Sequence, residues 1–173
     1  TTPKSAVKRG VFLVSEDRKG EGLFLIRSAR ENLTISKNDN SFFLNLRKEK
    51  GIVEKSIQQL KIKVFSQEQE VGNLSGGNQQ KVIFGKWLER SPQVFMMDEP
   101  TRGIDVGAKY EIYELIINMA KQGKTIIVVS SEMPEILGIT NRIGVMSNGR
   151  LSGIVNTKET NQEELLRLSA KYL

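Results

Sequence analysis

Two short apolar runs, separated by one predicted helix, constrain the fold of this chain most. Residues 94–97 read Val-Phe-Met-Met and residues 125–129 read Thr-Ile-Ile-Val-Val. Unbroken apolar runs of this length are typical of parallel strands that are covered on both faces. Between them, apolar residues recur at helical spacing after Asp105, a good N-cap, and before Gly123, a good C-terminal stop. This βαβ order predicts a parallel sheet with a right-handed crossover, and therefore an α/β fold.

Periodicity and turn residues predict the other elements in the same way. Residues 31–50 have no clear period and collect Asn, Ser and Lys, so we expect a loop-rich connector there. The helix after Gly77 is expected to place its lysines, Lys81 and Lys86, away from its apolar face. The remaining expectations are a helix over 3–9, a strand over 11–14, helical residues around 52–60 and 134–137, a hairpin of 143–146 with 151–155 around a type I′ turn at Asn148-Gly149, and a helix over 162–173.

Length and composition limit the classes of protein to consider. A chain of 173 residues is long enough for one core, so we expect one domain or most of one. It begins Thr1-Thr2 without Met, which suggests a piece of something longer. The sequence has no apolar run near the roughly 20 residues that a membrane span needs, so we expect a soluble piece. It also has no cysteine, so any metal should be hard and oxygen-bound.

The net charge of +6 raises the question of nucleic-acid binding. Lys and Arg are scattered along the chain rather than gathered in one stripe, and aromatic residues are only 6% of the total, which leaves few stacking platforms. We therefore expect a solvated basic surface and no nucleic-acid partner.

Ser75-Gly76-Gly77 stand at the start of a predicted helix. A helix N-terminus exposes unpaired N–H groups and a partial positive charge, so glycines there let a phosphate approach while the serine hydroxyl adds a donor. A serine N-cap followed by two glycines can also simply start a helix, with no ligand bound. These three residues alone therefore leave both interpretations open.

Asp98 and Glu99 come directly after a buried strand. Adjacent carboxylates repel each other, so their pairing favours a cation or a catalytic function over chance. The first can hold Mg²⁺ and the second can orient and deprotonate a water molecule. Solvated acids that end a strand are the alternative. The chain contains no G-x-x-x-x-G-K-[ST] phosphate loop, so a nucleotide site built here lacks its central part.

Three strings carry a resemblance to a known family: LSGGNQQKV at 74–82, VFMMDEPTRGID at 94–105 and VVSSEMPEI at 128–136. They resemble the signature motif, the Walker B strand with D-loop, and the switch loop of ABC-transporter nucleotide-binding domains. With SEDRK at 15–19, the wording is similar to the second half of tandem ATP-binding subunits of bacterial sugar importers, of the galactose/methyl galactoside type with the ribose type as near relative. The resemblance is specific over residues 72–155 and looser over 3–33.

The resemblance implies a fold and a set of roles. The fold is a P-loop NTPase-like α/β fold, a mostly parallel sheet with flanking helices and a C-terminal β-hairpin, in which residues 1–173 form a partial nucleotide-binding domain without the P-loop part. ATP and Mg²⁺ are the implied cofactors. The implied site residues are Asp98 for Mg²⁺, Glu99 as the base, Ser131 at the switch position, and Ser75, Gly76, Gly77, Asn78, Glu16 and Asp105 for contacts with nucleotide or the dimer interface.

Two of these positions depart from the family pattern. Glu16 stands where many ABC ATPases have glutamine, which adds negative charge near phosphates. Ser131 stands where they have histidine, and a serine can donate a hydrogen bond but cannot carry positive charge. We expect the site built on Glu99 to turn over slowly or differently.

The resemblance also implies a function and partners. The function is that of an ATPase fragment that energises import of a galactose-like sugar and lies at the cytoplasmic face of the bacterial inner membrane. The partners are a second nucleotide-binding domain in a head-to-tail ATP sandwich, a transmembrane permease and, indirectly, an extracytoplasmic sugar-binding protein. One alternative is a non-hydrolytic half that only completes the partner's ATP site, which Ser131 favours and Glu99 opposes. Another is an ABC ATPase that acts on nucleic acid or ribosomes, which the scattered charge opposes. We expect the isolated chain to be inactive and to leave apolar sheet surface uncovered.

Overall fold

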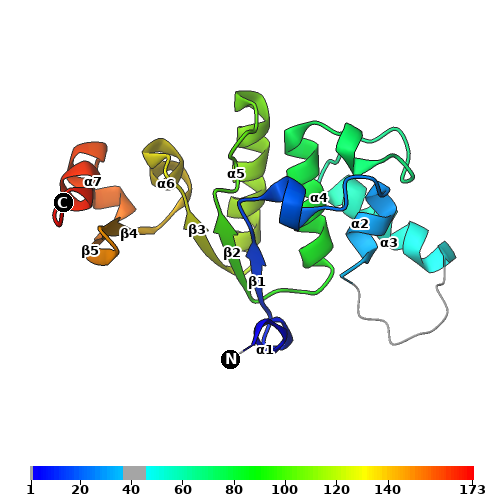
Figure 1. The fold of residues 1–173 in the computed structure, drawn as a ribbon, viewed down its shortest axis with the longest axis horizontal. Helices are drawn as coiled ribbons and strands as arrows, with labels where there is room; N and C mark the ends of the chain where they lie inside the picture. Colours follow the sequence, from blue (N-terminus) through cyan, green and yellow to red (C-terminus); the bar gives the residue numbers. More distant parts are fainter. Residues whose placement is uncertain (1, 37–45) are drawn as a thin grey trace. The chain divides into compact units, whose positions relative to one another are not determined.

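The computed structural model describes residues 2–36 and 46–173. The chain divides into two compact units, residues 1–129 and 130–173, which are described separately (Figure 1). The first unit contains α1 (Pro3–Lys8), β1 (Val11–Val14), the π-helical turn η1 (Arg18–Gly22), α2 (Ala29–Thr34), α3 (Leu46–Gln59), η2 (Val71–Asn73), α4 (Gly76–Leu88), β2 (Val94–Asp98), α5 (Val106–Lys121) and β3 (Thr125–Val129). The second contains α6 (Met133–Ile139), β4 (Arg142–Ser147), β5 (Arg150–Asn156), η3 (Thr157–Glu159) and α7 (Gln162–Ser169). Within the described part, no helix is long and apolar enough to cross a membrane.

The first unit is built on a parallel sheet of three strands in the order β1-β2-β3. Val14 is paired with Met97, and Asp98 with Val129, so the carboxyl ends of the strands meet at one edge. Because β2 and β3 are parallel neighbours joined by α5, the predicted βαβ unit is confirmed. The segments that leave the three strands therefore begin at a common edge, where open α/β sheets bind ligands.

The two faces of this sheet differ. On one face Phe12 and Phe95 are buried, and the indole of Trp87 in α4 packs on Phe12 with ring centroids 5.1 Å apart. On the other face Leu13 is 57% exposed and Ile127 is 47% exposed. The prediction that these strands are covered on both faces is wrong for the described part of the first unit, because the helices of that unit leave this face exposed. The prediction of uncovered apolar sheet surface is confirmed.

The predicted connector over residues 31–50 is wrong at both ends, since α2 runs to Thr34 and α3 starts at Leu46; residues 37–45 lie outside the described residues. A capping box starts α2: Ser28 Oγ accepts from the Glu31 N–H, and the Glu31 carboxylate accepts from the Ser28 N–H at 2.9 Å. Ser-x-x-Glu is a helix-start signal that outweighs the polar composition of the residues after Thr34.

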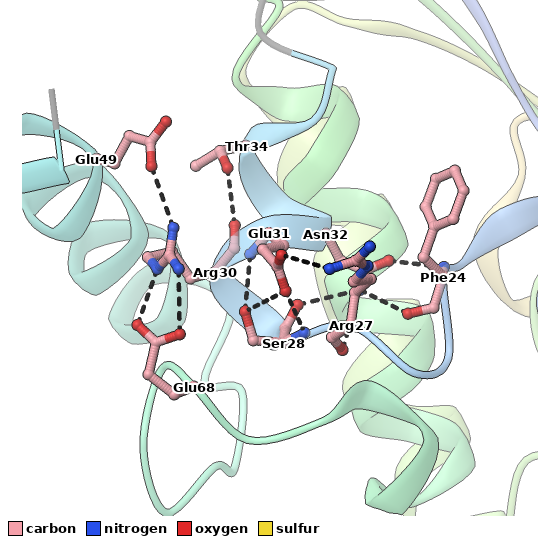
Figure 2. A network of polar contacts seen from close by, with 9 residues as sticks. All are labelled: Phe24, Arg27, Ser28, Arg30, Glu31, Asn32, Thr34, Glu49 and Glu68. Carbon is pink, nitrogen blue, oxygen red and sulfur yellow. Dashed lines mark hydrogen bonds and ion pairs between the residues drawn. The ribbon is translucent and has the colours of Figure 1, made fainter. Parts of the chain in front are cut away.

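Side chains tie α2 to its surroundings (Figure 2). The Asn32 side chain is buried, donates to the carbonyl oxygens of Phe24 and Ser28, and accepts from the Phe24 N–H. Figure 2 shows the Arg30 guanidinium between two carboxylates, with Nε 2.8 Å from Glu68 and Nη1 3.3 Å from Glu49. This network fixes the turn that precedes α2 and the segment that leads towards α4.

The second unit contains the predicted hairpin. Strands β4 and β5 are antiparallel, and Asn148 and Gly149 between them have φ of 44° and 75°, as a type I′ turn requires. Helix α7 packs on the hairpin, with Ser152 Oγ donating to the Leu168 carbonyl at 2.8 Å. The predicted C-terminal helix is confirmed but ends at Ser169.

Candidate functional site

The two acids lie at the carboxyl end of the middle strand. Asp98 is the last residue of β2 and Glu99 is the next residue; both are half-buried. Glu99 has φ of 45°, its N–H donates to the Val129 carbonyl at 2.9 Å, and its own carbonyl accepts from the Arg102 N–H at 3.1 Å. A left-handed backbone at a residue other than glycine costs about 1–3 kcal/mol and persists only where the surroundings enforce it. Glu99 is therefore held in one backbone conformation at the sheet edge.

The acids described at this edge form no cluster of metal ligands, and one carboxylate is a donor set that suits a metal ion bound mainly by phosphate and water. In the ranges 2–36 and 46–173 there is no cluster of three or more His, Cys, Asp or Glu side chains that could hold a metal ion. Mg²⁺ typically takes one or two carboxylates and fills its remaining positions with water and substrate phosphates. Asp98 can supply one such carboxylate.

Glu16 makes a contact that the sequence did not predict. Its carboxylate forms an ion pair with the Arg102 guanidinium, which comes from the loop three residues after Glu99. The side chains are 43% and 66% exposed, so solvent screens the pair and its contribution to stability is small. The pair nevertheless offsets the negative charge that Glu16 brings to this edge. The only hint of this ion pair in the sequence is that Arg102 follows closely after Asp98 and Glu99.

Ser75 is the N-cap residue of α4 but does not cap the helix with its side chain. Its Oγ accepts a hydrogen bond from Asn78 Nδ2 at 2.9 Å, and Asn78 Oδ1 in turn accepts from the Lys63 N–H at 2.9 Å. By contrast, the side chain of Asp105 caps α5, accepting from the Ala108 N–H at 2.9 Å as predicted. The first turn of α4 therefore keeps N–H groups directed at the exposed end of the helix, an arrangement that suits an anion.

The two glycines in the first turn of α4 also have packing reasons. A Cβ on Gly77 would lie 2.6 Å from the Cβ of Ala108, so this glycine lets α4 approach α5. A Cβ on Gly76 would lie 3.1 Å from the Gly103 carbonyl oxygen and 3.2 Å from Arg18 Nη2. Packing supports the ligand-free interpretation of Gly77 and is compatible with phosphate contact at Gly76.

The prediction that the lysines of α4 face away from the core is wrong. Lys81 is 2% exposed, and its ammonium donates to Glu111 of α5 at 2.6 Å and to the Lys61 carbonyl at 2.9 Å. The hydrogen bond from Lys81 lowers the pKa of the Glu111 carboxyl. Lys86 is also buried and donates to the Gly22 carbonyl at 2.6 Å, and burial lowers its pKa. The acceptors lie far away in the sequence, so helical spacing carried no signal for them.

The structure groups the predicted site residues into two sets within the first unit. Asp98 and Glu99 lie at the end of β2 on the carboxyl edge, and Glu16 is paired with Arg102 in the loop beyond them. Ser75 and Asn78 form the second set, at the start of α4. Ser131 is exposed and belongs to the second unit, so it is described with that unit and not with Glu99.

Comparisons with known proteins identify relatives of this chain. A family model described as ABC transporter matches residues 4–102. Galactose/methyl galactoside import ATP-binding protein MglA of Treponema denticola is 62% identical over 98% of this chain, and its counterpart of Treponema pallidum is 58% identical over 98%. The chain spans 35% of the length of each of these two relatives.

Solved structures share the fold. A nucleotide-free ATP-binding cassette from an ABC transporter matches with a TM-score of 0.76 and 22% identity, over 97% of this chain and 68% of that chain. A dimeric ATP-binding cassette in a post-hydrolysis state bound to ADP and Pi matches with a TM-score of 0.73 and 18% identity, over 91% of this chain and 68% of that chain. At these identities the likeness concerns the fold alone.

Proposed function

This chain belongs to the ABC transporter family and has its α/β ATPase fold, and we propose that it is the part of a sugar-importer ATPase that carries the catalytic base of one ATP site and the signature helix of another. The geometry that supports this most is Glu99, held by two backbone hydrogen bonds in a left-handed conformation at the end of β2. A base for phosphoryl transfer to water must be positioned rigidly, because positioning and electrostatics provide most of the catalysis.

In the first site, Glu99 orients a water molecule for attack on the γ-phosphate of ATP and accepts its proton. Asp98, beside it, would hold Mg²⁺, which when bound neutralises charge on the phosphate oxygens. Glu16 keeps its ion pair with Arg102, so that its carboxylate repels the phosphates less than a free one would. We assign Ser131, by its place in the family motif, as a hydrogen-bond donor at the switch position.

In the second site, the start of α4 meets the γ-phosphate of an ATP held by another nucleotide-binding domain. Because Ser75 Oγ accepts its hydrogen bond from Asn78, its own hydroxyl hydrogen is left to donate outward. The backbone N–H groups of the first turn and the positive end of the helix add to this contact. Asp105 lies in the D-loop at the interface of the same head-to-tail sandwich.

Similarity to the MglA proteins supports the choice of transporter. We place the chain in the C-terminal half of a tandem ATP-binding subunit at the cytoplasmic face of the inner membrane. Its partners there are the other nucleotide-binding domain and the permease, with an extracytoplasmic sugar-binding protein acting through the permease. The substrate class is galactose and its methyl glycosides.

Reconstitution tests this proposal. The full-length subunit, its permease and the sugar-binding protein are placed in vesicles, and uptake of radiolabelled methyl galactoside is measured with and without ATP on the side of the subunit. Uptake that requires ATP and is abolished by Ser75→Arg supports the assignment, because the larger cation fills the phosphate position. Uptake that does not depend on ATP, or that survives Ser75→Arg, refutes it.

A non-hydrolytic role is the second candidate, favoured by Ser131 in place of the switch histidine. In that case the chain only completes the partner's ATP site, and Glu99→Gln leaves both ATPase activity and uptake unchanged. Under either role the isolated chain neither binds ATP tightly nor hydrolyses it, because Asp98 and Glu99 cannot replace a phosphate loop and its lysine.

A further inference from the structure

We propose that Arg18 is a positioning residue that holds the start of α4 against the loop after β2 and so sets where Ser75 meets a phosphate. Arg18 is the first residue of η1, in the segment after β1. This inference rests on the proposed function, since it concerns the signature half of that ATPase.

The Arg18 guanidinium lies where three segments meet. Its Nη1 donates to the Arg102 carbonyl at 3.3 Å. Its Nη2 lies beside the two glycines on either side: a Cβ on Gly76 would be 3.2 Å from it, and a Cβ on Gly103 would be 3.8 Å from it. The Gly103 carbonyl is itself close to Gly76, since the same Cβ would be 3.1 Å away. The planar side chain of Arg18, which belongs to η1, therefore lies beside both the start of α4 and the loop after Glu99.

A second arginine makes the connection reciprocal. While Arg18 bonds the backbone of Arg102, the Arg102 guanidinium is paired with Glu16, two residues before Arg18. The segment after β1 and the loop after β2 are thus joined in both directions. A shift of the loop that contains Glu99 is transmitted through Arg18 to the start of α4.

Charge pairing does not explain the position of Arg18. No ion pair to a carboxylate is found for Arg18 among residues 2–36 and 46–173, and its Nε is buried without a hydrogen-bond partner. Burial lowers the pKa of its guanidinium, and the positive end of α4 is close by, which disfavours a cation. The guanidinium instead supplies a rigid, planar group with several N–H donors beside the backbones of Gly76 and Gly103. A lysine side chain has no such planar group.

Steady-state ATPase kinetics of the full-length subunit with its permease test this role. We compare the wild type with Arg18→Ala, Arg18→Lys, Ser75→Ala and the double variant Arg18→Ala/Ser75→Ala. Arg27→Ala is the matched control, since the Arg27 side chain is 61% exposed and pairs with Glu31, four residues along the chain. Thermal melting of each variant reports on folding.

Arg18→Ala is expected to lower kcat at least about tenfold with the KM for ATP changed less than about twofold, because a misplaced contact affects the reacting geometry more than nucleotide binding. Arg18→Lys keeps the charge but not the planar group and is expected to lose at least about threefold. The double variant should be within about twofold of the slower single variant, because both changes disrupt one contact. Arg27→Ala should match the wild type.

A wild-type kcat for Arg18→Ala overturns the inference, and so do single losses that multiply in the double variant. If Arg18→Ala does not fold, Arg18→Lys carries the test, and its full activity overturns the inference. Measuring Glu99→Gln in parallel distinguishes a failure of the proposed function from a failure of the inference about Arg18. An inactive wild-type complex, or an unaffected Glu99→Gln, counts against the proposed function; an active wild type with a slow Glu99→Gln and a normal Arg18→Ala counts against the inference alone.

Discussion

The side-chain oxygen of Ser75 accepts a hydrogen bond from the side-chain amide of Asn78, 2.9 Å away, and not from a backbone N–H of α4. Asn78 is itself held by the Lys63 N–H. The serine at this helix start is therefore arranged to face outward, whereas Ser28 at the start of α2 caps its own helix. The same residue type at the same helical position therefore makes different hydrogen bonds in the two places.

This difference predicts unequal costs of two identical substitutions. Ser28→Ala removes a side-chain cap and should lower the free energy of unfolding by about 1–2 kcal/mol. Ser75→Ala removes no cap and should cost less than about 0.5 kcal/mol, as for other surface changes. Urea unfolding of both variants measures the two values, and equal costs would show that Ser75 caps α4.

Gly77 is predicted to be fixed by packing as well as by function. Gly77→Ala puts a Cβ 2.6 Å from that of Ala108 and should destabilise the chain by about 1–3 kcal/mol, since overpacked cores must shift. Gly51 in α3 is the matched control: a Cβ there meets no atom within 4 Å, so Gly51→Ala should stabilise by about 0.5–1 kcal/mol. Adding Ala108→Gly to Gly77→Ala should recover part of the loss in thermal melting, and no recovery would place the clash elsewhere.

The buried ammonium of Lys81 depends on Glu111. Glu111→Gln leaves that ammonium with the Lys61 carbonyl but without its carboxylate, and because Glu111 is 43% exposed and partly screened by solvent, the change should cost about 1–2 kcal/mol. Lys63→Met is the control, since Lys63 is 77% exposed and 3.9 Å from the same carboxylate, and it should change stability by less than about 0.5 kcal/mol. Denaturant unfolding distinguishes the two variants; a small effect of Glu111→Gln would mean that the Lys81 ammonium does not depend on this carboxylate.

The same pair predicts a pH dependence. The hydrogen bond from Lys81 lowers the pKa of Glu111 below its ordinary 4.5, so between the folded and unfolded pKa values the unfolded chain binds more protons. The stabilisation is complete above the unfolded pKa and is lost as the pH falls through the folded one. Unfolding free energies measured from pH 7 down to about pH 3 should fall less steeply in Glu111→Gln. Identical slopes would remove Glu111 as the cause.

Local signals in the sequence were enough to predict the positions of the strands and of the helix that connects two of them. The apolar runs placed β2 and β3, Asn148-Gly149 placed the hairpin turn, and Asp105 placed the start of α5. The signal for α2, the Ser28-x-x-Glu31 capping box, is equally local, but the prediction for residues 31–50 used polar composition alone and did not include it. Order along the chain therefore predicted most of the α/β core.

Contacts between distant segments were not predictable in the same way. Lys81 reaches Glu111 and Lys86 reaches Gly22, so helical spacing alone assigned both lysines to solvent. The pair of Glu16 with Arg102 depends on two loops that meet only when β1 and β2 are neighbours. The apolar residues Leu13 and Ile127 were predicted to be buried but are exposed, because an apolar run does not show which face of the sheet the helices cover.

Single-turnover ATP hydrolysis by the assembled importer is the sharpest test of Glu99 as the proposed base of an ATP site. Full-length subunit in complex with its permease is mixed with substoichiometric radiolabelled ATP, and phosphate release is followed for the wild type, Glu99→Gln and the exposed control Glu163→Gln. We predict that Glu99→Gln is slower by at least about 100-fold while it still binds ATP, and that Glu163→Gln matches the wild type. Phosphate release by Glu99→Gln at the wild-type rate would contradict the account.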